Sequence, residues 1–399
     1  MALTNITLWD ALRAKFPQFR SNTAKATAEL FTAKGFEQLS SVDPGTLNDF
    51  FSLSMRVYLQ LINVSRAKDT LEAKGFGEYY DMPLGAYIQR IAINSIKPIS
   101  PAYKGLTNGT APDPFVVRKP TQNERMYQQN FDYASLVTIP DEFAMKQIFI
   151  SEYGMSEFMA GIFAGLENGY INQVYLNKLE AINAGLNSAA HPLKDTQKYK
   201  FIVAGDEPTA AELTEMILTV KNIVSAMDLG SQTDAYNALG FMTTQDVSRL
   251  KMLVRPGYKN AIATKVLASA YNQERLNLPI DVIEVPHFGG LTPTDGATTP
   301  ATLYPQYNTL GEVIKFNTVA AGTGTDVDIE DVVWSDPNAD VVAVIADKGW
   351  IFTTRQNPYS VEPIRNPRGL YTNYWASSPN NAISVDALYN VVTLSKATS

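Results

Sequence analysis

The stretch that decides the fold is SEFMAGIFAGLENGYINQVYLNKLEAINAGLN, residues 156–187. Its apolar residues recur mostly at steps of three to four, which predicts an α-helix with one buried stripe. The stripe comprises Phe158, Ile162, Leu166, Tyr170, Val174, Leu179, Ile182 and Leu186. The opposite face is predicted to be polar and includes Lys178. At 1.5 Å per residue this helix spans roughly 48 Å, longer than a small domain is wide.

Three glycines, Gly161, Gly165 and Gly169, lie four residues apart and therefore fall along one line of this helix. Each costs about 1 kcal/mol relative to Ala, so the first half of the helix needs tertiary packing. Two interpretations are open. The helix is a core helix whose glycines admit a bulky neighbour, or it is a spine whose backbone a sheet or another copy of the chain approaches closely.

Composition limits the classes of function. The 399 residues are 45% hydrophobic, enough for a sizeable core and two or three lobes. Without cysteine the chain has no disulfide, no thiolate metal ligand and no thiol nucleophile. The net charge of −7, with acidic and basic residues mixed throughout, argues against a protein that grips a phosphate backbone. No apolar run of membrane-spanning length and no secretion signal occurs, so we expect a protein that is cytosolic when made.

Residues 82–118 are predicted to form a long two-stranded arm. Residues 88–96 and 115–117 can extend as strands, and several prolines and the pair Asn108-Gly109 lie between them. Asn-Gly favours a tight hairpin turn because both residues tolerate positive φ. Isolated hairpins are marginal in water, so this arm should lie against another element. The alternative is an ordinary surface excursion within one subunit.

The middle of the chain alternates between strands and helices. A strand is expected over 123–137 and another over 198–203. Thr209 and Glu212 form a capping box that opens a helix with apolar residues at helical spacing up to Met227. A strand at 249–254, a helix at 259–273 and a strand at 280–285 then complete an α/β lobe. Residues 289–331, rich in Thr, Pro, Gly and Ala, are predicted to be an exposed excursion on this lobe and not a separate domain.

The last sixty residues read as strands around one sharp turn. Strands are expected at 341–345, 350–353, 370–375 and 388–394. Asn366-Pro367-Arg368-Gly369 fits a type I turn, with Asn first, Pro second and Gly fourth. Arg365 and Arg368 flank the proline. They either present guanidinium groups to a carboxylate on a neighbouring subunit or are solvated turn residues.

The sequence offers no constellation for catalysis, for a cofactor or for a metal. His191 and His287 are the only histidines, and neither has metal-ligand spacing. The acidic run at 326–331 lacks the glycine and the terminal glutamate of a calcium loop, which favours a solvated loop. Gly322-Thr-Gly324 is followed by no lysine and no helix start, so it predicts no phosphate cradle.

Several segments resemble one known family. The strings Ile345-Ala-Asp-Lys-Gly-Trp-Ile-Phe352 and Val361-Glu-Pro-Ile-Arg-Asn-Pro-Arg-Gly-Leu-Tyr-Thr-Asn-Tyr374 are similar to the closing segment of the major head protein of the small protein-primed podophages, the phi-29-like (picovirus) group. Pro83-Leu-Gly85 with Ile88 and Ile91, the aromatic run before the spine, and Val282-Ile-Glu-Val285 with Phe288 extend the likeness. In the same order, these cover about two thirds of the chain. The segment 289–331 has no counterpart that the resemblance identifies.

The resemblance implies an α+β fold of the tailed-phage capsid (HK-97) type. Its expected parts are an N-terminal helical arm at 1–66, an E-loop hairpin region at 67–138 and a peripheral domain at 139–204 with the spine at 156–187. An axial domain follows at 205–340 with the excursion 289–331, and the C-terminal strands at 341–399 return to the peripheral domain. Asn108, Gly109, Arg365 and Arg368 become candidates for the subunit interface, Asn366, Pro367 and Gly369 for a structural turn, and Gly161, Gly165 and Gly169 for spine packing.

The function implied is that of a major capsid protein, without enzymatic activity. It would self-assemble as pentamers and hexamers into the icosahedral head around the double-stranded DNA of a short-tailed bacteriophage. Expected partners are other copies, a scaffolding protein, a portal or connector, and packaged DNA on the inner face, with no membrane. The protein would lie in the host cytoplasm before assembly and in the virion capsid afterwards. A phage tail-borne adhesin or cell-wall hydrolase is the alternative, and a cytosolic α/β enzyme is a third hypothesis.

Overall fold

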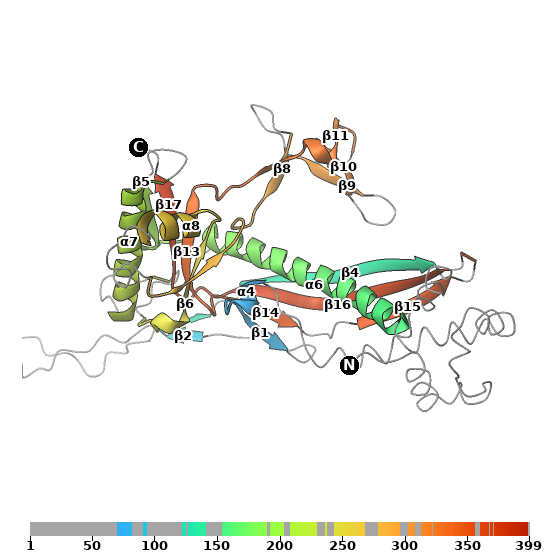
Figure 1. Ribbon diagram of the computed structural model, residues 1–399, viewed down its shortest axis with the longest axis horizontal. Helices are drawn as coiled ribbons and strands as arrows, with labels where there is room; N and C mark the ends of the chain where they lie inside the picture. Colours follow the sequence, from blue (N-terminus) through green and yellow to red (C-terminus); the bar gives the residue numbers. More distant parts are fainter. Residues whose placement is uncertain are drawn as a thin grey trace, which may run out of the picture.

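The structure places two sheets and two long helices around a shared junction, with a thin excursion projecting from it (Figure 1). It is a computed structural model, and it describes residues 70–81, 91–93, 122–124, 127–140, 154–189, 192–202, 208–229, 236–237, 243–267, 278–295, 302–307, 313–320, 322–355, 360–366, 368–369 and 371–397. The helices predicted within 1–66, the hairpin tip at Asn108-Gly109, and His191 lie outside these residues.

The spine sheet is built around one long strand, β16 (Tyr371–Val385). Strand β4 (Tyr127–Pro140) pairs with β16 along its whole length. On the other edge, β15 (Ser360–Asn366) pairs with the first half of β16 and β14 (Ile351–Arg355) with the second half. All these pairs are antiparallel, and β1 (Glu78–Asp81) adds a parallel edge to β14. The strand predicted before the spine is therefore confirmed and gains a partner from the far end of the sequence.

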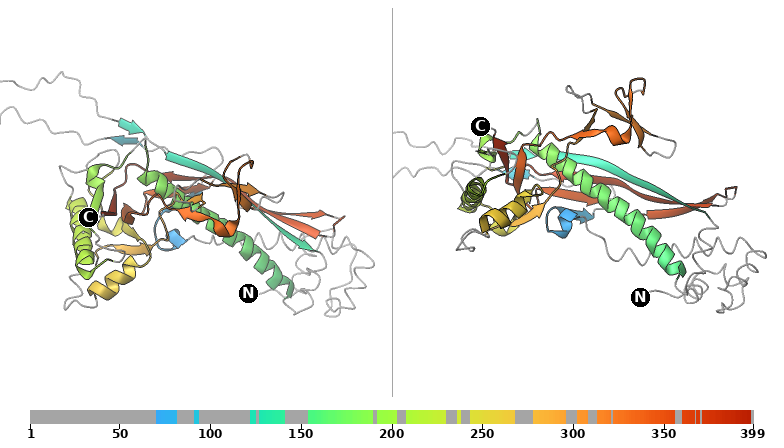
Figure 2. Two further views of the ribbon diagram at one scale, coloured as in Figure 1. Left: turned by 90° about the horizontal axis from the view of Figure 1, so that it is seen from above. Right: turned by 45° about the horizontal axis from the view of Figure 1, so that its top comes forward.

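Helix α6 (Gly154–Leu186) lies along the spine sheet, as Figure 2 shows from two further directions. The long helix predicted at 156–187 is confirmed. Strand β4 contacts it through Tyr133, whose ring packs edge-on against Tyr170 with centroids 5.2 Å apart. The Tyr133 hydroxyl also donates to the Leu166 carbonyl over 3.2 Å.

The expected stripe of α6 is confirmed from Leu166 to Leu186, whereas the side chain of Phe158 lies outside what the structure describes, and two positions differ from the prediction. Phe163 is buried, whereas Ile162 is only partly covered. Lys178, assigned to the polar face, is 1% exposed. The reason is geometric: residue 178 lies one turn from Val174 and from Ile182, which are both buried, so it belongs to the same line of the helix.

A second sheet forms the α/β lobe, with the order β5-β17-β13-β6-β7. Its strands are β5 (Lys198–Ile202), β6 (Leu250–Val254), β7 (Asp281–Glu284), β13 (Val341–Asp347) and β17 (Val391–Ala397). The boundary expected at residue 340 is therefore wrong, because β13 and β17 belong to this lobe and only β14, β15 and β16 return to the spine sheet. Strand pairing depends on residues far apart in the sequence. The hydrophobic runs of β13 and β17 therefore do not reveal which of the two sheets each strand joins.

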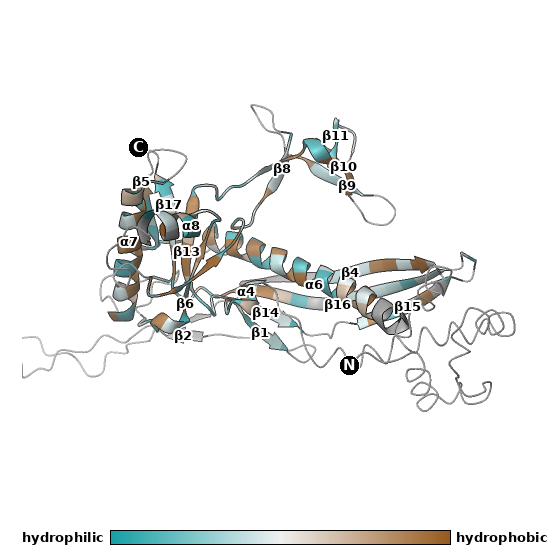
Figure 3. Cartoon of the chain, in the orientation of Figure 1, coloured by the Kyte–Doolittle hydropathy of each residue, from teal (hydrophilic) through white to brown (hydrophobic). Residues whose placement is uncertain are grey.

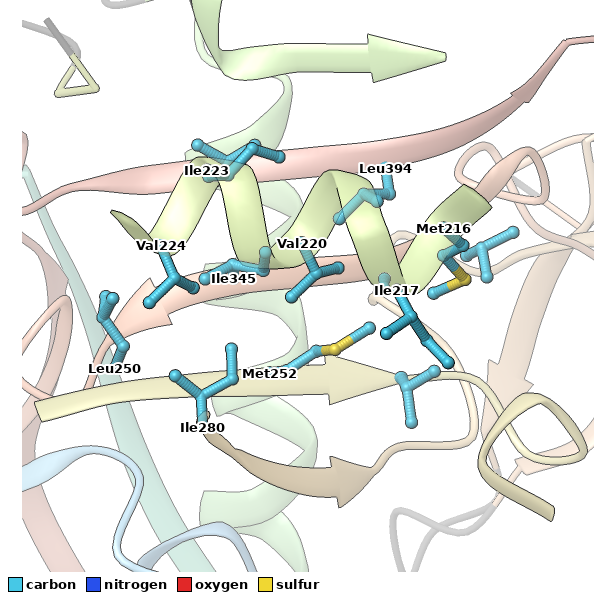
Figure 4. Packing of buried hydrophobic residues seen from close by; sticks show 14 of the residues in the cluster. Met216, Ile217, Val220, Ile223, Val224, Leu250, Met252, Ile280, Ile345 and Leu394 are labelled. Atoms are coloured by element: carbon cyan, nitrogen blue, oxygen red, sulfur yellow. The ribbon is translucent and has the colours of Figure 1, made fainter. Parts of the chain in front are cut away.

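Helix α7 (Ala210–Leu229) covers one face of the lobe sheet (Figure 4). Seven of its residues point into the core: Leu213, Met216, Ile217, Val220, Ile223, Val224 and Met227. The predicted capping box is present. The Thr209 amide donates to a Glu212 carboxylate oxygen over 2.7 Å, and the Glu212 amide donates to the Thr209 hydroxyl over 3.4 Å.

Short helical turns complete the lobe and its surroundings. Helix α8 (Tyr258–Ala261) continues as a π-helix, Ile262–Leu267, so the helix predicted over 259–273 is described as far as residue 267. The remaining turns are α4 (Thr70–Ala73), η3 (Asp195–Gln197), η4 (Val247–Arg249) and η6 (Ile329–Asp331). The base of the predicted arm is a pair of short antiparallel strands, β2 (Ile91–Ile93) and β3 (Gln122–Glu124).

The excursion contains more regular structure than expected. Strands β8 (Thr292–Thr294) and β12 (Val333–Ser335) pair as an antiparallel stalk. Beyond them, β9 (Tyr304–Tyr307), β10 (Val313–Asn317) and β11 (Asp326–Val327) form a three-stranded tip sheet. We call residues 289–335 the excursion. Figure 1 shows it projecting away from α6 and from the lobe.

The excursion is fixed to α6 at its base. Gly289 and Gly290 have φ values of +77° and +73°, and a Cβ on Gly289 would lie 2.1 Å from the Leu179 carbonyl oxygen. Only glycine allows this backbone conformation and this close an approach. The Gly290 amide donates to both carboxylate oxygens of Glu180 over 3.0 Å. The point where the chain leaves the lobe is therefore set by the second half of α6.

Candidate subunit-interface surfaces

The turn between β15 and β16 is held by the side chain of Asn366. Its Oδ1 accepts from the Arg368 amide over 3.0 Å and from the Gly369 amide over 3.2 Å, and its Nδ2 donates to the Tyr371 hydroxyl over 2.7 Å. A Cβ on Gly369 would lie 2.2 Å from the Tyr371 ring. These contacts support the structural role predicted for Asn366 and Gly369, which stays a prediction, while Pro367 lies outside the described residues.

The two arginines of this hairpin are placed differently. Arg368 is exposed on the turn. Arg365 pairs with Thr372 through the strand backbone, and its side chain lies outside what the structure describes. Figure 1 shows the hairpin at the end of the spine sheet farthest from α7. An ion pair between either arginine and a neighbouring subunit therefore remains a prediction.

The three spine glycines do not have the same surroundings. A Cβ on Gly169 would lie 2.9 Å from the Tyr133 hydroxyl, so here the sheet does approach the helix backbone. At Gly161 and Gly165 no described atom outside the helix backbone lies within 4 Å of a Cβ position. A close neighbour from the same chain, the first interpretation of these glycines, is therefore absent there among the described residues. An approach by another copy stays a prediction at those two positions.

The spine sheet exposes apolar side chains on the face turned away from α6. In β16, Thr372, Tyr374, Ala376 and Ser378 are buried on the face that Tyr133 shares, whereas the alternating residue Trp375 is 42% exposed. Ile364 of the neighbouring strand is 55% exposed. Sequence reasoning missed this surface. The residue types carry no clear signal of it, because Tyr374 and Trp375 are adjacent and both large, although only Tyr374 is buried.

The junction between the two sheets holds a deeply buried carboxylate. Asp347, 1% exposed, lies at the end of β13 and accepts from the Nε and Nη2 of Arg249 over 3.1 and 3.0 Å. The same Nη2 reaches Glu78 of the spine sheet over 3.4 Å. The hydrogen bond that Arg249 donates to Asp347 raises the pKa of Arg249. This arrangement joins one strand of each sheet and leaves the buried carboxylate satisfied, which indicates a structural role.

The residues tested for chemistry have ordinary structural partners. The Nδ1 of His287 accepts from the Gly289 amide over 3.1 Å, and burial lowers its pKa. In the acidic run, Asp326 pairs with Lys315 and accepts from Asn317 over 2.8 Å, and these two hydrogen bonds, that of Lys315 first, lower its pKa. Among the residues that the structure describes, no cluster of three or more acidic, histidine or cysteine side chains could hold a metal ion.

Within the described part of the chain, no helix combines the length and the apolar character needed to cross a membrane. Three surfaces of the described chain stand out: the uncovered face of the spine sheet, the exposed residues of α6 and the excursion. All three are candidates for contact with other protein chains.

Solved structures share this fold. The chain aligns with a chain in the capsid structure of Staphylococcus phage Andhra with a TM-score of 0.55 and 14% identity, covering 84% of this chain and 86% of that one. It also aligns with a chain in the structure of the head fiber and inner core protein gp22 of native bacteriophage P68, with a TM-score of 0.52, 15% identity and coverages of 83% and 86%. The expected α+β fold of tailed-phage capsid proteins is therefore confirmed.

Sequence comparison gives the family. The chain is 24% identical over 239 residues to the major capsid protein of Bacillus phage B103 and 23% identical over 241 residues to that of Bacillus phage PZA. Each match covers 60% of this chain and spans 40% of the length of the relative. The model of the Phi29-like phage major capsid protein family matches residues 11–395. With nearly the whole chain inside that match, and with the fold agreeing independently, the protein belongs to the Phi29-like phage major capsid protein family.

Proposed function

We propose that this chain is the shell-forming subunit of a phage head, and that it assembles with copies of itself into an icosahedral capsid around double-stranded DNA. The observation that carries the proposal is the spine layer. It is a thin layer of one sheet and one helix, with Trp375 and Ile364 exposed on its far face. A large exposed aromatic residue beside an aliphatic one is typical of a surface that another chain covers.

The candidate interface residues take their place in this proposal. The hairpin end with Arg365 and Arg368 would meet a carboxylate of the next subunit, and the arm with Asn108 and Gly109 would lie over a neighbour. The open backbone at Gly161 and Gly165 would admit the close approach of another copy. Each contact can be weak, because closure of a shell engages many identical contacts at once.

The remaining partners follow from the same role. A scaffolding protein would guide assembly, a portal or connector would occupy one vertex, and packaged DNA would face the inner wall. A mildly acidic wall would keep the DNA from adhering, through like-charge repulsion. The subunits, grouped as pentamers and hexamers, would pass from the host cytoplasm into the virion. The role is structural and not enzymatic. A tail-borne adhesin or cell-wall hydrolase has no support, since both named sequence relatives are major capsid proteins.

Expression of the full chain, alone and together with the scaffolding protein of its phage, tests the proposal. Sedimentation and negative-stain microscopy should show shells or shell fragments. A chain that stays monomeric under all these conditions, although correctly folded by circular dichroism, would contradict it.

A pair of variants on one strand tests the surface that carries the proposal. Trp375→Ser combined with Ile364→Ser should leave the melting temperature of the unassembled chain nearly unchanged and should strongly reduce shell formation. Tyr374→Ser, at the neighbouring position that faces α6, is the matched control and should lower the melting temperature itself, since Tyr374 is 3% exposed. Normal shells from the double variant would rule out the far face of the spine sheet as an interface.

A further inference from the structure

The excursion combines exposed apolar side chains with a concentrated negative charge. Twelve large hydrophobic residues of the described chain are exposed, and seven of them lie in the excursion, including Trp334 at 55% and Tyr307 at 60%. Trp334 packs edge-on against Phe316 of the tip sheet, so one side of its ring is supported while the other faces solvent. Figure 3 shows brown, hydrophobic segments on the stalk and the tip, well away from either core.

The charge of the excursion is strongly one-sided. Residues 289–335 contain six acidic residues and one basic residue, a net charge of −5, whereas the whole chain has a net charge of −7. The basic residue, Lys315, is already paired with Asp326. Asp328, Glu330 and Asp331 are exposed at the turn beside the stalk. The surface offered to a partner is therefore acidic and apolar together.

This charge excludes two occupants. Packed DNA would be repelled, because its phosphates carry the same sign. A second excursion would be repelled as well, since two such segments would bring net charges of −5 together. The partner that fits is a segment that is basic and apolar.

The chain itself contains one such segment. The arm, residues 82–118, holds four basic residues and one acidic residue, a net charge of +3, and Lys119 follows directly. It is also rich in isoleucine, at positions 88, 91, 93, 96 and 99. The described base of this arm, β2 and β3, lies apart from the excursion (Figure 2), which favours a contact between copies over one within a copy.

We propose that the excursion is the docking surface for the arm of a second copy of this chain. The acidic side chains at 328–331 orient the basic arm, and the apolar residues of the stalk and tip bury its isoleucines. Charge complementarity of this kind mainly sets which partner is chosen and in which register it binds. The inference rests on the proposed function, because it requires that copies of the chain assemble.

A charge-swap experiment on the full chain tests this contact. The excursion variant is Glu330→Lys with Asp331→Lys, and the arm variant is Lys97→Glu with Lys104→Glu. Each alone places like charges opposite each other at every copy, so we expect the yield of sedimenting shells to fall about tenfold or more. The two variants combined in one chain restore the opposite signs and should return the yield to near that of the wild type.

The control changes the net charge of the chain equally at another place. Glu215→Lys with Asp228→Lys alters two exposed acidic residues of α7. When the α7 control and the arm variant are combined in one chain, the yield of shells should stay as low as with the arm variant alone. Circular dichroism melting of each unassembled chain verifies that folding is intact. If the excursion variant proves unstable, Glu330→Gln with Asp331→Asn replaces it and should lessen the defect of the arm variant severalfold.

The outcomes separate the two proposals. A wild-type chain that forms no shells contradicts the proposed function. If the wild type forms shells, then normal assembly of the excursion variant overturns the docking surface. A defect that the arm variant cannot rescue overturns the assignment of the arm as the occupant.

Discussion

Helices α6 and α7 are both long, yet they are buried in different ways. Every large apolar position of α7 except Leu218 and Leu229 is buried, and all of them pack against one sheet of the same chain. Helix α6 has two halves. Its second half, with Leu179, Ile182 and Leu186, enters the core at the junction. Among the described side chains of its first half, one line of residues is buried and the others are partly or fully exposed.

This difference shows how a sequence divides its surface between folding and assembly. A helix with a single wide apolar stripe finds its partner inside its own chain. A helix whose faces mix glycine, asparagine and isolated apolar residues has surface left over after its own sheet is satisfied. In a family of shell proteins, that surplus is the expected site of contact between copies.

The largest effect should come from the core of α7. Ile217→Ala removes a side chain that is 2% exposed and should lower the free energy of unfolding by about 2–5 kcal/mol. Leu218→Ala, at the adjacent position with 59% exposure, should change it by less than about 0.5 kcal/mol. Urea titration of both variants measures the contrast. Similar losses in the two would mean that α7 is covered on both sides.

The second half of α6 can be tested through the glycine that packs against it. Gly289→Ala introduces a methyl group 2.1 Å from the Leu179 carbonyl oxygen, at a positive φ, and should destabilise the chain by about 2–3 kcal/mol. Gly257→Ala is the control, because its φ is also positive, at +91°, but no described atom lies within 4 Å. It should show only the backbone strain, about 1 kcal/mol. Equal melting temperatures for the two would contradict the close contact.

Replacing a glycine in the first half of α6 should raise the stability of the chain and not lower it. Gly165→Ala meets open space and replaces a poor helix former, so it should stabilise the unassembled chain by about 0.5–1 kcal/mol. Gly169→Ala should gain less, because its methyl group would press on the Tyr133 hydroxyl that bonds the Leu166 carbonyl. Thermal melting ranks the two variants. A destabilising Gly165→Ala would show that the same chain does cover this line.

The smallest effect concerns pH at the base of the excursion. Burial lowers the pKa of His287, and Arg255 acts in the same direction while Asp336 and Glu180 oppose it. The unfolded chain therefore binds more protons, so stability should fall as the pH drops below about 6.5 and level off below the folded pKa. His287→Asn keeps an acceptor for the Gly289 amide. It should remove the contribution of His287 to the pH dependence of stability. Urea midpoints between about pH 7.5 and about pH 5 measure it.

Local signals in the sequence were sufficient to predict structure wherever residues close together in the chain determine it. The capping box at Thr209 and the stripe of α7 each depend on residues within a few positions of one another, and both are confirmed. The phase of α6 was predicted less well. Lys178 reads as polar by residue type, although helical geometry places it on the buried line.

Non-local features were beyond the sequence patterns. The boundary at residue 340 failed because β13 leaves one sheet and the chain continues directly into β14 of the other. The small sheet of the excursion was missed because its strands are only two to five residues long and depend on pairing between segments separated in the chain. The exposed residues Trp375 and Trp334 could be assigned to a surface only after the partner strands were known.

The central position of β16 has a consequence for how the chain folds as it is synthesised. Strand β16 begins at Tyr371, about 230 residues after β4 ends at Pro140. At about 5–20 residues per second, a newly made β4 waits roughly 10–50 s for its partner to leave the ribosome. Strand β17, which lies between β5 and β13, emerges later still. Both sheets thus close only late in synthesis. A chain terminated before Tyr371 can complete neither sheet, and one terminated between β16 and β17 still lacks a strand of the lobe sheet, so either is excluded from an assembly of native subunits.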